Sequence, residues 1–291
     1  MLGAIIGDIA GSTYEVKEVR ALKNKQKVSY EERIKILDKN IPLFIEGSSV
    51  TDDSILTVAI ADAILNNNDY NYYLNLYGNR EVNLGNDEYG RSKFGNGFVS
   101  WLSDNSKNNS YGNGSAMRIS PVGFYYEDIN DVLEQTYLAT IPSHNHEESI
   151  KCASAVTTAI YLAKNNYTKE EIKNYIENNY FKLDYNLEEL QHNYTFTSRA
   201  INSVPQAIFC FLESNDFEDA IRKAISIGGD TDTIAAITGS ISEAYYGIPE
   251  YLINESIPYL KEYMKEVVNK FYEKKNIKEK ILCKKNNKRS N

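Results

Sequence analysis

Cysteine is scarce in this sequence, with three among 291 residues, at Cys152, Cys210 and Cys283. Three cysteines so far apart fit neither a disulfide framework nor a zinc-binding pattern. We therefore expect a cytoplasmic protein, because a reducing compartment leaves such thiols unpaired.

Long apolar segments are missing as well. No uncharged apolar run approaches the roughly 20 residues that a membrane-spanning helix needs. The apolar stretch 1–10 lacks a basic start and is interrupted by Asp8, which is not typical of a signal peptide. The 32 basic residues are outnumbered by 40 acidic ones, which argues against a protein that coats nucleic acid. We expect a globular monomer with no membrane association and no sequence-specific nucleic-acid partner.

Strand signals are few, whereas apolar residues recur with a helical period. Within 55–65 they fall at i, i+3, i+4, i+7 and i+8, which is one face of a helix. Thr168 and Glu171 have the spacing of a capping box, which marks the start of a helix. In the helix expected at 199–213, Pro205 should cause a kink or delay the start. Further helices are predicted at 152–163, 168–180, 199–213, 216–227 and 234–245. The sequence therefore predicts an all-α fold.

The chain has no internal repeat of about 20–50 residues and no Pro- or Ser-rich linker, so we expect one catalytic domain over residues 1–260. Residues 261–291 contain eleven basic and four acidic side chains, which predicts a basic C-terminal helix or tail. It would be either a solvated end or a segment that binds an anionic partner. Residues 70–113 are rich in Asn, Gly and Tyr, and we expect a long loop there that is functional or disordered.

Two acidic clusters each stand immediately before an apolar helix: Thr51-Asp52-Asp53 and Asp230-Thr231-Asp232-Thr233. One interpretation is capping, because Asp and Thr at a helix start satisfy free N–H groups. Two carboxylates and a hydroxyl in each cluster are more than a cap needs. The alternative is that both clusters face one pocket, where four carboxylates would take up protons or bind cations.

The ligands that these clusters offer are all oxygens, which suit Mg²⁺ or Mn²⁺ and not zinc. Four carboxylates with threonine hydroxyls suggest two ions that share a bridging carboxylate. The three histidines, His144, His146 and His192, are too few and too badly spaced for a soft-metal site. The sequence therefore predicts a site for two Mg²⁺ or Mn²⁺ ions.

Glycines mark a third element at Ser110–Ala116. Gly112 and Gly114 would let backbone N–H groups approach a phosphate, and Tyr111 is available to stack on a base. The alternative is that Gly-Asn-Gly forms an ordinary turn. No Gly-Lys-Ser/Thr follows, so the segment is not a Walker A loop.

Glycines also line one helix face near the beginning of the sequence, at Gly3, Gly7 and Gly11. This i+4 spacing predicts tight packing of that face against another element. It would place Glu15 at the end of a rigid element, where its carboxylate faces the pocket.

Taken together, these elements resemble the ADP-ribosylglycohydrolase family. The matching motifs run in the family's order from residue 3 to about 247: Gly7-Asp8, Gly11-Ser12-Thr13-Tyr14-Glu15, Thr51-Asp52-Asp53, Ser110-Tyr111-Gly112-Asn113-Gly114-Ser115-Ala116-Met117-Arg118, Ser143-His144 and Gly229-Asp230-Thr231-Asp232-Thr233. The family often has Thr-His where this chain has Ser143-His144. The resemblance implies an orthogonal multi-helix fold with a dimetal cleft, and a hydrolase that releases ADP-ribose from a modified protein or a small conjugate.

The same resemblance implies roles for individual residues. One ion would be held by Thr51, Asp52, Asp53 and Asp232, and the other by Asp230, Asp232 and Thr233. Glu15 would be a movable metal ligand, and the catalytic residues would be Glu15, Asp52 and Asp53. Substrate would contact Asp52, Ser110, Tyr111, Gly112, Asn113, Gly114, Ser115, Met117 and His144. The diphosphate would lie at Ser110–Met117, adenine against Tyr111, and a phosphate or ribose against His144.

Two other functions remain open. Asp230-x-Asp232-Thr233 copies the nucleophile motif of haloacid-dehalogenase-type phosphatases, although that motif follows an apolar strand and leaves Thr51-Asp52-Asp53 unexplained. The second is a catalytically silent relative that only binds ADP-ribose. The acceptor is also open, because the family handles ADP-ribosyl-arginine, ADP-ribosyl-serine, O-acetyl-ADP-ribose and poly-ADP-ribose. We expect the loops at 70–110 and 181–198 to decide between them.

Overall fold

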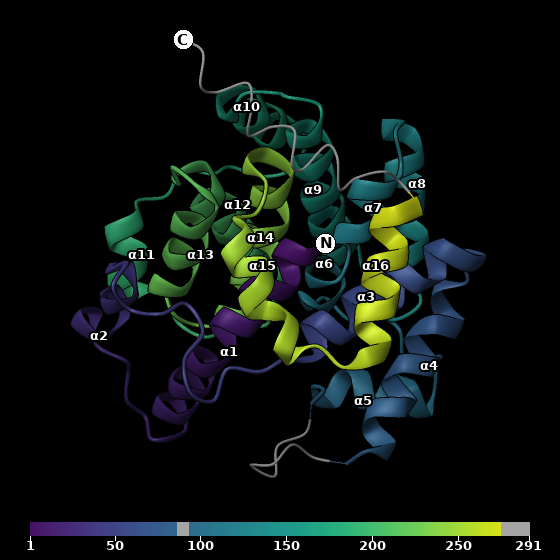
Figure 1. The fold of residues 1–291 in the computed structure, drawn as a ribbon, viewed down its shortest axis with the longest axis horizontal. Helices are drawn as coiled ribbons and strands as arrows, with labels where there is room; N and C mark the ends of the chain where they lie inside the picture. The colour runs from purple at the N-terminus through teal and green to yellow at the C-terminus, as the bar shows by residue number, and fades with distance from the viewer. Residues whose placement is uncertain (86–92, 275–291) are drawn as a thin grey trace.

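The computed structural model describes residues 1–85 and 93–274, and this part of the chain is built from helices without a β-strand (Figure 1). The α-helices are α1 Leu2–Lys23, α2 Tyr30–Ile34, α3 Asp52–Asn66, α4 Tyr70–Asn83, α5 Asn96–Ser103, α6 Gly114–Met117, α7 Ser120–Tyr125, α8 Ile129–Thr140, α9 Glu147–Lys164, α10 Lys169–Asn179, α11 Leu187–Asn193, α12 Val204–Leu212, α13 Phe217–Ser226, α14 Thr231–Tyr246, α15 Glu250–Ser256 and α16 Glu262–Lys274. Short 3-10 turns lie at Lys35–Leu37, Ala200–Asn202 and Ile257–Tyr259. The predicted all-α fold is confirmed.

The centre of the fold is the contact between α1 and α14, where the glycine face of α1 meets the other helix at backbone distance. A Cβ added to Gly7 would lie 2.7 Å from the backbone nitrogen of Ala236, and one added to Gly11 would lie 2.6 Å from that of Asp232. Side chains larger than hydrogen therefore cannot occupy this face. The predicted tight packing is confirmed, and it fixes the beginning of α14 beside α1.

Glu15 lies within α1, not at its end, because α1 continues for two more turns to Lys23. The expectation of a terminal position was wrong. The glutamate comes one turn after Gly11, and it therefore lies next to the start of α14.

The other predicted helices agree with the structure within a few residues at each end. The capping box at the start of α10 forms both of its hydrogen bonds, between Thr168 and Glu171. Pro205 lies in the first turn of α12, after the 3-10 turn Ala200–Asn202, so it delays the helix start and does not kink it.

The prediction of a long loop at 70–113 was wrong, because the helices α4 and α5 lie within this range. Asp69 caps α4 by accepting a hydrogen bond from the Tyr72 backbone nitrogen. Tyr70, Leu74 and Tyr77 then form a buried stripe at helical spacing. The helical period of these buried residues is hard to recognise in the Asn-rich sequence, because the stripe is narrow and most of the remaining positions are polar or exposed.

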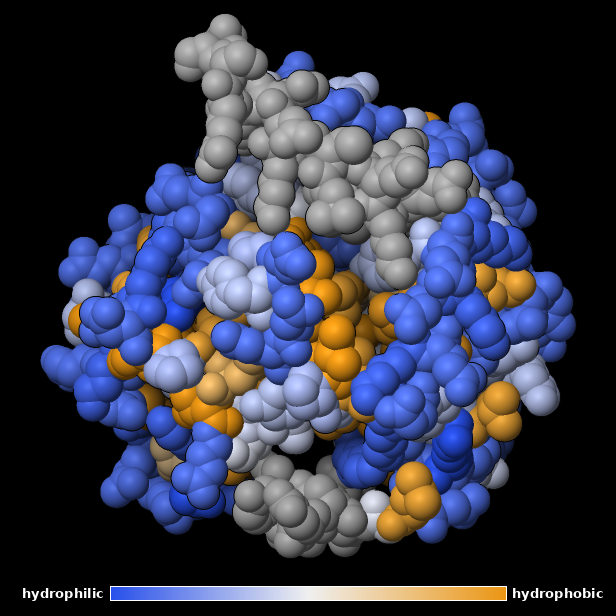
Figure 2. Space-filling model, in the orientation of Figure 1, coloured by the Kyte–Doolittle hydropathy of each residue, from blue (hydrophilic) through white to orange (hydrophobic). Residues whose placement is uncertain are grey.

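The α16 helix packs against α3, and Met264 and Phe271 are both fully buried there. The remainder of the predicted basic tail, residues 275–291, lies outside the described residues. Figure 2 shows hydrophilic residues over most of one face of the molecule, with apolar residues gathered between α15 and α16. Within the described helices, none combines the length and the apolar character needed to cross a membrane.

Candidate active site and metal centre

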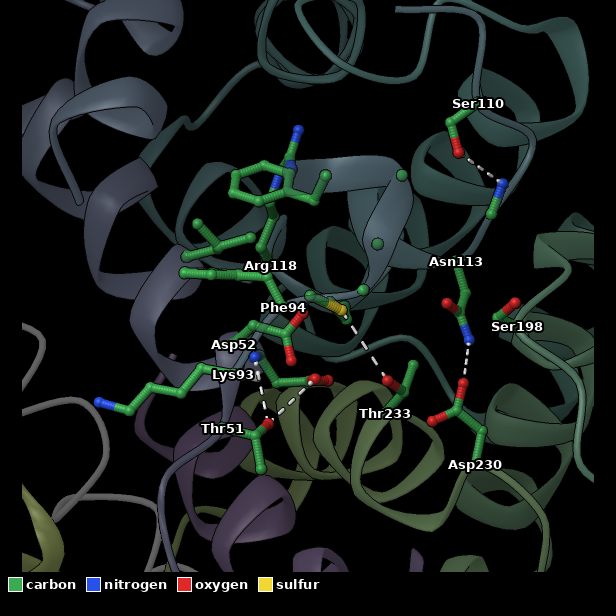
Figure 3. A pocket seen from close by; sticks show the side chains of 18 of the residues that line it. Thr51, Asp52, Lys93, Phe94, Ser110, Asn113, Arg118, Ser198, Asp230 and Thr233 are labelled. Atoms are coloured by element: carbon green, nitrogen blue, oxygen red, sulfur yellow. Dashed lines mark hydrogen bonds between the residues drawn. The ribbon is translucent and has the colours of Figure 1, made fainter. Parts of the chain in front are cut away.

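The two acidic clusters and the glycine-rich segment open onto one cavity of about 1080 Å³. Figure 3 shows Thr51 and Asp52 at one side of this cavity and Ser110 and Ser198 at the other. The predicted site residues that line it are Glu15, Thr51, Asp52, Asp53, Ser110, Gly112, Asn113, Gly114, Met117, His144, Asp230, Asp232 and Thr233. The predicted convergence of the two clusters is therefore observed.

Two sets of three carboxylates meet closely enough to hold a cation. One carboxylate oxygen each from Asp8, Asp53 and Asp232 lies within 4.8 Å of the others, and so does one each from Glu15, Asp230 and Asp232. Asp232 belongs to both sets. A carboxylate in this position is the arrangement that a bridged pair of divalent ions requires.

Capping explains only part of these clusters. Thr51 is the N-cap of α3, and its hydroxyl accepts a hydrogen bond from the Asp53 backbone nitrogen. At the start of α14, by contrast, Asp230 forms no side-chain cap. Its carboxylate instead accepts a hydrogen bond of 2.7 Å from the Asn113 side chain of the glycine-rich segment (Figure 3). The geometry therefore favours a shared pocket over two independent caps.

Asp8 is a site residue to which the sequence reasoning gave no role. It is fully buried, and its carboxylate accepts hydrogen bonds from the backbone nitrogens and the hydroxyls of Thr51 and Ser54. These bonds fasten the beginning of α3 to α1. The signal is visible in the sequence as a lone carboxylate inside the apolar stretch 1–10, and Gly7-Asp8 is among the motifs that resemble the family.

Burial and mutual repulsion raise the pKa values of this group of carboxyls. Burial raises the pKa of Asp8 to about 6, although hydrogen bonds from Ser54 and Thr51 act in the opposite direction. Burial, and then the neighbouring carboxylates, raise the pKa values of Asp52, Asp53 and Asp232 well above the usual range. A bound cation would let these groups ionise together.

Asp53 supplies a further sign of a missing partner. Its Oδ1 atom is buried and has no hydrogen-bond partner among the described residues. An unsatisfied buried carboxylate oxygen is costly unless something positive faces it. Together with a ligand set made only of oxygens, it shows that the residues present suit a hard divalent cation.

The glycine loop, residues Ser110–Gly114, is held from both sides. The backbone nitrogen of Asn113 donates to Ser198 O at 2.8 Å, and the hydroxyl of Ser149 donates to the carbonyl oxygens of Ser110 and Gly112. These bonds hold the loop in place beside the cavity.

Tyr111 and Ser115 are the two predicted substrate-binding residues that do not line the cavity. Ser115 is fully buried. Tyr111 has an exposed fraction of 55% and meets the edge of the His146 ring, with Arg199 over its face. Its ring is therefore exposed to solvent between Ser110 and Gly112, which both line the cavity.

The opposite wall contains residues that the sequence reasoning did not single out. Phe94, Phe98 and Trp101 line the cavity as an aromatic cluster, in the region expected to be loop. Arg118 also lines it, although it was quoted only as part of a motif. The aromatic residues contact one another at a spacing of three and four residues, but the cavity that they line is shared with residues far away in the chain.

Comparison with known proteins agrees with this geometry. The family model described as ADP-ribosylglycohydrolase matches residues 1–279. The chain belongs to the ADP-ribosylglycohydrolase family. As a member of this family it is a hydrolase of glycosidic bonds, and the predicted family, fold and enzyme class are confirmed.

Individual members of the family resemble the chain over different lengths. ADP-ribosylarginine hydrolase Tri1 of Pseudomonas putida (strain GB-1) is 22% identical over 274 residues, which cover 85% of this chain and 70% of the relative. ADP-ribosylhydrolase ARH3 of Mus musculus is 24% identical over 327 residues, covering 86% and 83%. An uncharacterized protein of Archaeoglobus fulgidus is 29% identical over 181 residues, but the match spans only 55% of this chain and 57% of that protein.

A solved structure titled "ADP-ribosylglycohydrolase-related protein complex" superposes with a TM-score of 0.62. It covers 94% of this chain and 96% of its own, at 19% identity. At that identity the likeness concerns the fold, which the two chains share over nearly their whole length.

Proposed function

We propose that this chain is an Mg²⁺- or Mn²⁺-dependent hydrolase that releases ADP-ribose from an ADP-ribosylated protein side chain or a small ADP-ribose conjugate. The observation that carries the proposal is the pair of carboxylate sets that share Asp232, in the same cavity as the glycine loop. The carboxylate sets suit cations, and the glycine loop, which contacts Asp230 through Asn113, suits a phosphate-bearing ligand.

The oxygen ligands divide between two cation positions. Thr51, Asp52, Asp53 and Asp232 would hold one ion, and Asp230, Asp232 and Thr233 the other. Asp8 would keep Thr51 and α3 in place through its hydrogen bonds. Two bound divalent ions would bind and orient the ribose hydroxyls and would lower the pKa of an attacking water.

The chain's own carboxylates would serve the chemistry at the anomeric carbon. Hydrolysis there passes through an oxocarbenium-like transition state, which a nearby negative charge stabilises. Asp52 lines the cavity at the start of α3, and Asp53 follows it. Both would hold the water, and one of the two would accept the single proton that it gives up. Glu15, from the middle of α1, would be a movable metal ligand that helps to activate the same water.

The glycine loop beside Asp230 would bind the rest of ADP-ribose. Ser110, Gly112, Asn113, Gly114 and Met117 would surround the diphosphate, where the small residues leave room for its oxygens. Ser115 lies behind them, so it would support the loop from within. Tyr111 would stack on adenine at the mouth, and His144 would donate a hydrogen bond to a phosphate or ribose oxygen.

A haloacid-dehalogenase-type phosphatase is the less favoured alternative. That chemistry needs the Asp230-x-Asp232 motif after an apolar strand, whereas here α13 and Gly228-Gly229 precede it and the described residues form no strand. Trapping an aspartyl-phosphate would favour this alternative. A catalytically silent member that binds ADP-ribose would leave every substrate intact.

We further infer that the protein is a cytoplasmic monomer. Cys152 and Cys210 are buried and unpaired, which is typical of a reducing compartment. Cys283 lies outside the described residues.

The acceptor is tested with a panel of ADP-ribosyl-arginine, ADP-ribosyl-serine, O-acetyl-ADP-ribose and poly-ADP-ribose, each with Mg²⁺ and with Mn²⁺. The measurement is free ADP-ribose, and EDTA serves as the control. We expect metal-dependent release from at least one substrate. ADP-ribose binding without release from any of them would support the silent alternative and contradict the proposal.

A further inference from the structure

Arg118, at the end of α6, is fully buried and forms no ion pair with a carboxylate in the described part of the chain. Its Nη2 donates to Ser143 Oγ at 2.7 Å and to Ala139 O at 3.3 Å. Burial lowers its pKa to about 9, so the guanidinium stays charged at pH 7. The charge of Asp52 acts against this lowering of the pKa, but no hydrogen bond joins Arg118 to that carboxylate among the described residues, so the cost of burying the guanidinium calls for a further role.

The hydroxyl of Ser143 links this arginine to His144. A guanidinium can only donate, so Ser143 Oγ must accept the bond from Arg118. The same oxygen lies 2.8 Å from His144 Nδ1. Ser143 is buried, and the described residues offer its hydroxyl proton no other acceptor. The proton therefore points at Nδ1, which must be the acceptor.

This arrangement determines which nitrogen of His144 carries the proton. A neutral imidazole has one donor and one acceptor, so an accepting Nδ1 leaves the proton on Nε2. Burial, and then the charge of Arg118, lower the pKa of His144 well below its ordinary range, so the ring is neutral. His144 is thus a single tautomer with one N–H to offer.

The Nε2 atom faces the glycine loop. A Cβ added to Gly114 would lie 3.0 Å from this nitrogen, and one added to Gly112 would lie 3.8 Å from it. All three residues line the cavity. The glycines therefore leave room in front of the one N–H that the ring can donate.

We propose that Arg118 is a positioning residue that acts through Ser143 to hold His144 as a neutral Nε2–H donor, aimed at an oxyanion in the glycine loop. That the oxyanion is a phosphate of ADP-ribose rests on the proposed function. The tautomer itself does not depend on it.

The opposite tautomer makes a different prediction. If Nδ1 carried the proton and donated to Ser143, the serine hydroxyl would be buried without an acceptor. Nε2 would then present a lone pair to the glycine loop and repel an oxyanion. The two arrangements are distinguishable by a direct measurement.

The direct test is a long-range ¹H–¹⁵N spectrum of protein labelled at its histidine nitrogens, recorded at pH 7 with Mg²⁺. The expected result is a neutral His144 with the chemical shifts of the Nε2–H form. A His144→Gln variant assigns the signals. An Nδ1–H form, or a charged ring, in the wild-type protein would overturn the inference, whatever substrate the enzyme proves to use.

Variants of Ser143 separate this role from a merely structural one. Ser143→Ala should let His144 populate both tautomers and weaken ADP-ribose binding in calorimetry by about threefold to tenfold, as expected for one hydrogen bond. Ser143→Thr keeps the hydroxyl and should restore both readouts. Ser256→Ala, another buried serine whose hydroxyl bonds within its own helix, is the matched control and should change neither.

Variants of Arg118 test the hydrogen bond from Arg118 to Ser143. Arg118→Lys keeps a charged donor and should retain the Nε2–H form, whereas Arg118→Met should lose it. If Ser143→Ala leaves the Nε2–H form and the affinity unchanged, the inference is wrong, even where Arg118→Met does not fold. Absence of ADP-ribose binding in the wild type would refute the proposed function. The tautomer of His144, measured in the ¹H–¹⁵N spectrum, would still decide whether the present inference holds.

Discussion

Replacing Asp232 by asparagine should abolish activity and at the same time stabilise the metal-free protein. Asp232 is the residue common to both carboxylate sets, and its Oδ1 accepts a hydrogen bond from the Thr233 backbone nitrogen at 2.8 Å. Asparagine has nearly the same shape and keeps that acceptor. The substitution therefore removes mainly the charge.

The size of the stabilisation follows from the distances. Two unit charges 4.8 Å apart repel by about 3.5 kcal/mol at an effective dielectric constant of about 20. Part of this repulsion is already relieved, because the pKa of Asp232 lies well above its usual range and the group takes up protons. We therefore expect Asp232→Asn to raise the free energy of unfolding in EDTA by about 2 kcal/mol.

Urea unfolding in EDTA at pH 7.5 measures this gain, and ADP-ribose release with Mg²⁺ measures the loss of activity. Changes even to residues that only support metal ligands cost about 10–100-fold, so we expect a loss of about 100-fold or more. Glu134→Gln, which removes one charge from an exposed site on α8, is the control and should change neither. Near-wild-type activity of Asp232→Asn would refute the shared-ligand assignment. A less stable metal-free variant would refute the repulsion argument.

Three further predictions follow from the same structure. Burial raises the pKa of Asp8 to about 6, above its value in the unfolded chain, so the metal-free fold loses stability as pH rises through 6. The increase in Tm on adding Mg²⁺ should therefore grow between pH 5 and pH 7.5, and a constant increase would contradict this. Gly7→Ala should cost about 3 kcal/mol in urea unfolding, because its Cβ would meet α14 backbone, whereas Gly97→Ala, which meets nothing within 4 Å, should be near neutral. Glu15→Ala should lower kcat more than it lowers bound metal measured by elemental analysis, and unchanged turnover would count against its proposed role.

Local patterns predicted those helices whose apolar faces are broad. The α3, α9 and α14 helices have such faces, and each was expected from the sequence. The α4 helix was missed because its buried stripe is narrow and lies among asparagines and exposed tyrosines. Its packing against α3, not its own composition, stabilises it as a helix.

The sequence suggested ligand chemistry at two helix starts, because Thr51-Asp52-Asp53 and Asp230-Thr231-Asp232-Thr233 each combine two carboxylates with a hydroxyl. Asp8 was given no role because it stands alone, and only its four hydrogen bonds to Thr51 and Ser54 show what it does. Arg118 was given no role for the same reason, since its partner Ser143 is 25 residues away.

The sequence by itself determined the types of group available: oxygen ligands at two helix starts, a glycine loop, and a glycine face on α1 that only another backbone could cover. Only the tertiary structure decided which of these groups share a site. Asp8, Asp53 and Asp232 meet within 4.8 Å because the glycine face of α1 brings α14 to backbone distance and Asp8 fastens α3 to the same helix. Helix packing of this kind is a contact between distant segments, and no local pattern in the sequence specifies it.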